Sequence, residues 1–124
     1  MIFGIGTDLI ETERIQKAIS KKRFLDMVYT EDEQKLIEGR VQKAAGNFAV
    51  KEAVVKAFGT GFRGISPKDI EVLRDDVGKP FVKCYGNAET FQKEHNITTI
   101  HVSISNLKEY AQAFVVLECK DNDV

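Results

Sequence analysis

The segment from Arg40 to Phe58 constrains the fold most, because it contains no proline and is followed by Gly59-Thr60-Gly61. These features predict one long helix that stops at Gly59. On a helical wheel its apolar side chains occupy two sides, one with Val41, Ala44, Ala45, Phe48 and Val55, the other with Val50, Ala53, Val54 and Ala57. We therefore expect a helix buried nearly all round, with the rest of the chain folded about it.

The composition can supply the core that such a helix needs. The chain has 124 residues, of which 43% are hydrophobic and 30% charged, and a chain of this size buries roughly two thirds of its unfolded surface. These values exclude disorder, collagen-like repeats and a disulfide scaffold. The net charge of -1 gives no global positive field that would favour nucleic acid. Without a linker or an internal repeat, residues 1–124 are expected to form a single domain.

Strand patterns lie on both sides of the long helix in the sequence. Residues 2–9 are β-prone and rich in glycine, which suits a strand whose backbone approaches another segment closely. Residues 69–74 and 79–85 flank a turn and predict a hairpin, and residues 99–106 and 110–120 alternate with a period of two. A capping box from Thr30 to Glu33 predicts a further helix. The expected fold is α+β, with a mostly antiparallel sheet packed on the long helix.

The last strand is apolar on both faces. One face carries Ala111, Ala113, Val115, Leu117 and Cys119, and the other carries Tyr110, Gln112, Phe114 and Val116. The second face is too apolar to leave in water over several residues. It therefore predicts a contact between copies of the chain.

Neither cysteine chemistry nor a membrane is expected. Cys84 and Cys119 have no CxxC spacing, and no histidines cluster with them. They are interpreted as small buried residues in a reducing cytoplasm, with neither a disulfide nor a zinc site. The longest apolar stretches are only a few residues, and Asp8 interrupts the first one. This excludes a membrane span and a signal peptide, so we expect a cytoplasmic protein.

Glu52 is the first candidate for chemistry, because it falls within an apolar stripe of the long helix. A carboxylate there needs a cation or hydrogen-bond donors to offset its desolvation. One interpretation is an ion pair with Lys56, one turn further on. The other is that Glu52 and Asp8 together bind Mg²⁺, which takes only one or two protein carboxylates. Both interpretations stay open at this stage.

Other candidates are weaker when taken alone. The glycines after the long helix could offer backbone N–H groups to a phosphate or simply end the helix. His101 lies on the polar face of a strand, where a hydrogen-bonded sheet residue and a catalyst are both possible. A basic segment contains Arg14, Lys17, Lys21 and Lys22. Their helical spacing predicts one positive face, which is either solvated or a dock for an acidic partner.

Four motifs occur in order along the chain: Gly4-Ile5-Gly6-Thr7-Asp8, FAVKEAVVKAFGTG over 48–61, Gly78-Lys79-Pro80, and HVSIS over 101–105. Together they resemble the holo-acyl-carrier-protein synthase family of phosphopantetheinyl transferases. The resemblance extends over nearly the whole chain, and the central motif is specific.

The resemblance implies transfer of phosphopantetheine from coenzyme A to a serine of acyl carrier protein. It implies that Asp8 and Glu52 bind Mg²⁺ and that Lys56 lies by the phosphates, with Glu52 and Lys56 as the catalytic pair. Coenzyme A is then expected at Lys56, Gly59, Gly61, Gly78, Lys79, Pro80 and His101. The family also implies a homotrimer with sites between subunits and a carrier-protein dock that includes Arg14.

Two positions depart from the family pattern. Asn47 stands where relatives often have arginine, and Asn106 where they often have histidine. Phosphate or nucleotide contacts at these two positions are therefore not carried over. The proton acceptor also stays open among Glu52, a metal-bound water and Lys56.

Two other functions use the same residues. A Mg²⁺-dependent phosphodiester or nucleotide hydrolase would use Asp8 and Glu52 with water as the nucleophile. A non-catalytic oligomeric binding module would use Glu52 and Lys56 as an ion pair and the basic segment as a dock. The first would release free phosphopantetheine, and the second would show no metal-dependent binding of coenzyme A.

Overall fold

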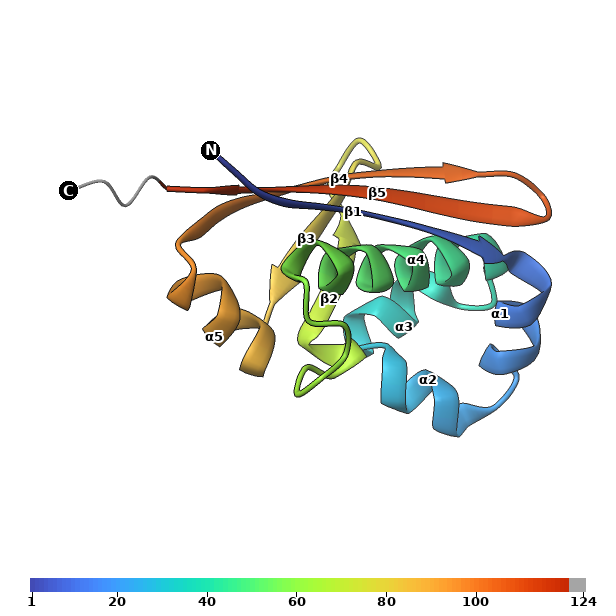
Figure 1. Cartoon of the computed structure of the whole chain (residues 1–124). Coiled ribbons are helices and arrows are strands. Elements are labelled where there is room, and N and C mark those ends of the chain that lie inside the picture. The colour runs from blue at the N-terminus through green and yellow to red at the C-terminus, as the bar shows by residue number, and fades with distance from the viewer. Residues whose placement is uncertain (121–124) are drawn as a thin grey trace.

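The computed structural model describes residues 1–120 and has the expected α+β architecture (Figure 1). The elements are β1 (Ile2–Glu11), α1 (Thr12–Ile19), α2 (Lys22–Val28), α3 (Glu31–Ile37), α4 (Val41–Phe58), a 3₁₀ turn η1 (Pro67–Asp69), β2 (Ile70–Arg74), β3 (Pro80–Cys84), α5 (Gly86–Glu94), β4 (Ile97–Asn106) and β5 (Tyr110–Cys119). The long helix, the capping box at Thr30 and the hairpin are all confirmed.

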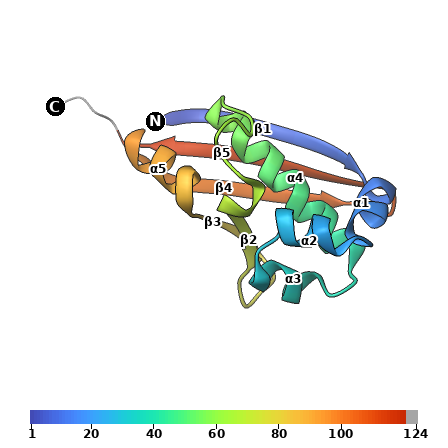
Figure 2. The ribbon, with the colours of Figure 1, turned by 90° about the horizontal axis from the view of Figure 1, so that it is seen from below.

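The strands form two antiparallel sheets. One has three strands in the order β1-β5-β4, and the other is the β2-β3 hairpin. The three-stranded sheet is one layer, with α4 directly beneath it and the shorter helices beyond (Figures 1 and 2). The opposite face of this sheet is covered by no element of the described part of the chain. The two layers place the core around α4.

Helix α4 packs so closely against β1 that two positions of the strand must be glycine. A Cβ at Gly4 would lie 2.2 Å from the carbonyl oxygen of Ala57, and one at Gly6 would lie 2.0 Å from that of Ala53. The backbone of β1 therefore rests directly on the helix, as its glycine content predicted. This contact fixes how Asp8, two residues further along, lies relative to the side chains of α4.

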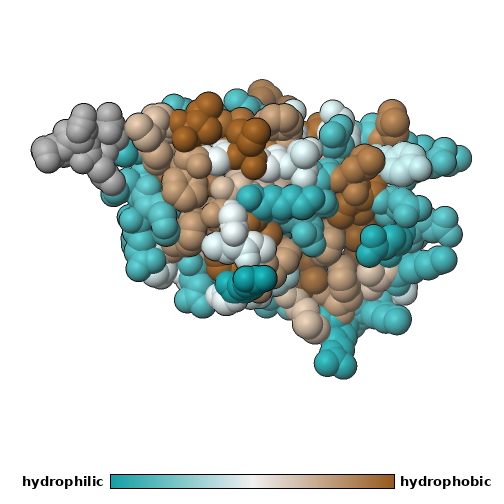
Figure 3. Space-filling model, in the orientation of Figure 1, coloured by the Kyte–Doolittle hydropathy of each residue, from teal (hydrophilic) through white to brown (hydrophobic). Residues whose placement is uncertain are grey.

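The two faces of β5 differ as expected. Its inner face is fully buried at Ala111, Ala113, Val115 and Leu117, whereas Phe114 on the outer face is 49% exposed. Next to it, Ile5 and Leu9 of β1 are 61% and 63% exposed, and hydrophobic patches follow the line of β1 in Figure 3. The outer sheet face is thus an apolar surface open to solvent in the single chain.

The basic segment, whose helical spacing predicted one positive face, is divided between two helices. Helix α1 ends at Ile19 and α2 begins at Lys22, because Lys21 between them has an extended backbone and the Ser20 hydroxyl donates to the carbonyl of Lys17 at 2.6 Å. The positive side chains therefore project from two helices. Among the described residues, no helix is both long enough and apolar enough to span a membrane.

Candidate active site

Strand β1 and helix α4 bring Asp8, Glu52 and Lys56 together in what we call the open cluster. The Lys56 Nζ donates to Asp8 Oδ1 at 2.9 Å and to the Thr7 carbonyl oxygen at 3.0 Å. The Glu52 side chain is half-buried and makes no hydrogen bond or ion pair with any described residue. Burial and the nearby Asp8 carboxylate raise the pKa of Glu52, and the positive charges of Lys56 and Arg14 oppose this shift.

Of the two interpretations of Glu52, the ion pair with Lys56 is absent from the described residues, because β1 crosses α4 and gives Lys56 a nearer partner in Asp8. Glu52 is also less buried than its place in the apolar stripe predicted. Its carboxylate consequently stays available to a ligand. No group of three or more His, Cys, Asp or Glu side chains within residues 1–120 is arranged to hold a metal. Two carboxylates alone suit Mg²⁺, which completes its coordination with water and phosphate oxygens.

The glycines after α4 end the helix. The backbone N–H groups of Gly59, Thr60 and Gly61 all donate to the carbonyl oxygen of Val55, at 3.1–3.2 Å. Gly59 has a φ of 84°, which ends the helix in a left-handed conformation. The interpretation of these residues as a helix stop is confirmed. Any contribution of Gly59 and Gly61 to binding comes from the open hollow of about 650 Å³ that this loop lines.

A second hollow lies between the first turn of α4 and the β2-β3 hairpin. We call it the cationic cavity; its volume is about 470 Å³, and it is lined by Arg40, Val41, Gln42, Lys43, Arg74, Gly78, Pro80, Ile104 and Asn106. The sequence motifs include Gly78 and Pro80 but gave no indication of Arg40, Lys43 and Arg74. Within the described chain, none of the three has a carboxylate partner within 4.0 Å. The cavity therefore attracts anions.

The Arg74 guanidinium is the most constrained of these cations. It is half-buried, and it donates a hydrogen bond to the neighbouring Leu73 carbonyl oxygen at 3.3 Å. Burial lowers the pKa of Arg74 from its ordinary value, but an arginine stays charged at neutral pH. Lys79, beside Gly78, is exposed at the turn. Asn106, a departure from the family pattern, lies at the cavity and donates to the Gln42 carbonyl oxygen at 3.3 Å.

The cationic cavity and the open cluster lie at different positions along α4. Val41 lines the cavity, and Glu52 is eleven residues further along, or about 16 Å at 1.5 Å per residue. His101 lies in neither place. It is on the outer face of β4, where its Nε2 is 2.5 Å from Glu118 Oε1, and this hydrogen bond lowers the pKa of Glu118. A single chain therefore distributes the expected coenzyme A residues over the open cluster, the hollow after α4, the cationic cavity and the outer sheet face.

Of the expected docking residues, Arg14 lies nearest to the open cluster. It is exposed, has no ion pair within the described chain, and its charge reaches Glu52. Lys17 and Lys22 instead pair with Glu13 at 3.4 Å and with Asp26 at 3.2 Å. Lys21 is exposed between the two helices.

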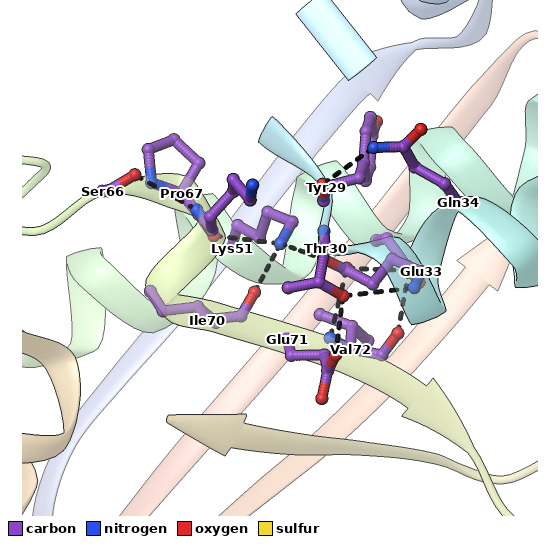
Figure 4. A network of polar contacts seen from close by, with 12 residues as sticks. Tyr29, Thr30, Glu33, Gln34, Lys51, Ser66, Pro67, Ile70, Glu71 and Val72 are labelled. Carbon is purple, nitrogen blue, oxygen red and sulfur yellow. Dashed lines mark hydrogen bonds and ion pairs between the residues drawn. The ribbon is translucent and has the colours of Figure 1, made fainter. Parts of the chain in front are cut away.

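A second polar cluster, which sequence analysis missed, is completely buried. Glu33, Asn47 and Lys51 are each 0% exposed, and Lys51 Nζ donates to Glu33 Oε1 at 2.7 Å (Figure 4). We call it the buried cluster. Asn47 Nδ2 donates to Glu33 Oε2 at 3.0 Å, so its amide nitrogen points into the core. The capping box indicated Glu33 and the helix pattern indicated Lys51 as a polar exception, but nothing in the sequence joined them.

Comparisons with known proteins identify the family of this chain. A family model of the 4′-phosphopantetheinyl transferase superfamily matches residues 4–115. The chain is 63% identical to the holo-[acyl-carrier-protein] synthase of Lachnoclostridium phytofermentans over 118 residues, covering 95% of this chain and 97% of that protein.

Solved structures agree as well. A Bacillus anthracis holo-(acyl-carrier-protein) synthase in complex with CoA (3′,5′-ADP) has a TM-score of 0.81 and 40% identity, covering 97% of this chain and 99% of that one. The Helicobacter pylori synthase in complex with coenzyme A has a TM-score of 0.84 and 29% identity, covering 92% and 99%. On sequence, fold and the position of its motifs, the chain belongs to the 4′-phosphopantetheinyl transferase superfamily.

Proposed function

We propose that this chain transfers 4′-phosphopantetheine from coenzyme A to a serine of apo acyl carrier protein, in the cytoplasm and in support of fatty acid biosynthesis. The products are holo acyl carrier protein and adenosine 3′,5′-bisphosphate. The observation that carries the proposal is the open cluster, where an unpartnered carboxylate, a second carboxylate and an ammonium group meet in a chain of this superfamily. The relatives named above are holo-acyl-carrier-protein synthases.

In the proposed reaction, the serine oxygen forms a bond to the phosphorus that carries pantetheine, and the bond from that phosphorus to the bridging oxygen breaks. Asp8 and Glu52 would hold Mg²⁺, which when bound neutralises the pyrophosphate. Lys56, oriented by Asp8 at 2.9 Å, adds positive charge beside the leaving phosphate. Glu52 is the proposed proton acceptor on this chain, because its side chain has no hydrogen-bond or ion-pair partner among the described residues.

We assign the nucleotide end of coenzyme A to the cationic cavity. Its three unpaired cations complement phosphate charge, and Gly78 and Pro80 line it as the resemblance implied. Lys79 lies next to them at the turn. Asn47 supplies no amide donor there, because both hydrogen bonds of its Nδ2 are made within the core.

The chain is proposed to act as a homotrimer with its sites between subunits. Three features support this assembly. The outer sheet face is apolar and open, and His101 lies on it. The cationic cavity and the open cluster are also about 16 Å apart along α4, or about three helical turns. A neighbouring copy would then complete each site. Sedimentation at falling protein concentration should show the trimer dissociating together with loss of activity, and a fully active monomer would contradict the assembly.

Mass spectrometry of an apo carrier protein incubated with this chain, coenzyme A and Mg²⁺ tests the function. The expected result is a mass increase of one phosphopantetheine group on the carrier and release of adenosine 3′,5′-bisphosphate. Release of free phosphopantetheine without change of the carrier would indicate the hydrolase instead. No binding of coenzyme A would indicate the binding module.

A further inference from the structure

The buried cluster joins α3, α4, η1 and β2 by direct hydrogen bonds. Lys51 of α4 donates to Glu33 of α3, to the Pro67 carbonyl oxygen at 3.0 Å and to the Ile70 carbonyl oxygen. Glu33 Oε2 also accepts from the backbone N–H of Val72 in β2 at 3.2 Å. Figure 4 shows these bonds converging from the helices onto the start of the hairpin. The position of the hairpin relative to α4 is thus set inside the core.

Asn47 completes this connection. Its Nδ2 donates both to Glu33 Oε2 at 3.0 Å and to the Val72 carbonyl oxygen at 2.9 Å. Val72 is therefore held through its N–H and through its carbonyl group. Arg74 follows two residues later on the same strand, and Gly78 and Pro80 follow across the turn. The cluster accordingly fixes the wall of the cationic cavity that the hairpin provides.

Stability alone does not account for such a cluster. A buried ion pair is often no more stabilising than apolar side chains of similar volume. The hydrogen bonds of the buried cluster are directional, because each requires its acceptor at one position. A shifted register of the hairpin against α4 would therefore leave a buried charge unpaired. Apolar contacts would permit such shifts at small cost.

The open cluster is positioned by different contacts. Asp8 and Glu52 are set by the close packing of Gly4 and Gly6 on α4, on the sheet side of the helix. None of the bonds of the buried cluster reaches β1. Its loss should therefore move the hairpin wall of the cavity and leave the carboxylates in place.

We infer that Glu33, Asn47 and Lys51 are positioning residues for the nucleotide end of coenzyme A. They hold the hairpin where Arg74 lies beside the cationic first turn of α4, so they act through Arg74 and do not touch the substrate. This inference rests on the proposed function, and it adds a separation of roles: the buried cluster governs binding of the nucleotide, and the open cluster governs transfer.

The test is the double variant Glu33→Met with Lys51→Met, which removes both charges together and keeps the side-chain volume similar. We expect the KM for coenzyme A and the Kd for adenosine 3′,5′-bisphosphate to rise about tenfold. The kcat at saturating coenzyme A, the KM for carrier protein and the binding of Mn²⁺ to the free protein should stay within about twofold. Amide hydrogen exchange in residues 72–84 should be faster without any substrate, and exchange in β1 should not change.

Leu117→Ala is the matched control, because Leu117 is fully buried but lies in β5 of the other sheet. It should lower thermal stability and leave the KM for coenzyme A unchanged. If the double variant does not fold, Asn47→Leu decides the matter, because it removes only the amide and should raise the same KM about threefold.

The inference is overturned if folded variants bind coenzyme A and adenosine 3′,5′-bisphosphate as the wild type does. An equal rise of KM in Leu117→Ala also overturns it, because the effect would then follow from lost stability. Failure of the proposed function is a separate result, seen in the wild type itself as a carrier protein that gains no mass.

Discussion

Helix α4 takes part in two lysine–carboxylate pairs of similar length and opposite character. Lys51 and Glu33 are 2.7 Å apart, and both side chains are 0% exposed. Lys56 and Asp8 are 2.9 Å apart, with side chains 52% and 16% exposed. In the buried cluster Glu33 uses both carboxylate oxygens within the chain, whereas the Glu52 side chain, next to Lys51, has no hydrogen-bond or ion-pair partner among residues 1–120. The lysine–carboxylate distance thus does not distinguish the two clusters. The unpaired Glu52 carboxylate identifies the open cluster as the one available to a ligand.

The largest effect is expected from Glu52→Gln in the open cluster. Loss of this carboxylate should reduce transfer about a thousandfold, because both cation binding and proton acceptance depend on it. The fold should be kept or slightly stabilised, since the amide removes a charge that burial and Asp8 disfavour. The rate is measured by mass spectrometry of the carrier protein, with the exposed Glu94→Gln as control. A normal rate at saturating Mg²⁺ would contradict the assignment.

Lys51→Met should lower stability, whereas Glu52→Gln keeps the fold and loses transfer. It leaves the Glu33 charge buried without its partner, which should cost about 3 kcal/mol of unfolding free energy. Urea denaturation of this variant and of Glu52→Gln measures the contrast directly. If Lys51→Met unfolds at the wild-type urea concentration, the expected contrast in stability between the two clusters fails.

Arg14→Glu examines the surroundings of the open cluster. Because Arg14 is exposed and acts on Glu52 from α1, we expect the KM for an acidic carrier protein to rise about tenfold. The KM for coenzyme A should not change, and added salt should reduce the difference between variant and wild type. Lys93→Glu on α5 is the control with the same charge change. Equal weakening of both substrates would exclude a dock at Arg14.

His101→Asn extends the comparison to an exposed pair and should have the smallest effect on stability. The His101 hydrogen bond lowers the pKa of Glu118, so its contribution is fully present above pH 4.5, the ordinary value, and is lost as pH falls below that value and through the lowered pKa of the folded state. With both side chains about half exposed, we expect no measurable change in unfolding at pH 7. If His101 completes the site of a neighbouring copy, the KM for coenzyme A should still rise. An unchanged KM would show that His101 does not contact coenzyme A.

Much of the fold follows from local sequence. The glycine stop after Phe58, the capping box at Thr30 and the alternation in β5 all act over a few residues, and all are confirmed. The division of the basic segment into two helices was missed, because Ser20 and Lys21 carry no strong breaking signal. Helical spacing alone could not reveal that break.

The sequence by itself determined the family and the fold class and singled out Asp8, Glu52 and Lys56 as candidates, because motifs and periodicity are properties of adjacent positions. Only the tertiary structure decided which side chains meet. It paired Lys56 with Asp8 across 48 positions and Lys51 with Glu33 across 18, and it gathered Arg40, Lys43 and Arg74 around one cavity. Such partners depend on how β1 and the hairpin cross α4, and that crossing is fixed by packing between distant segments.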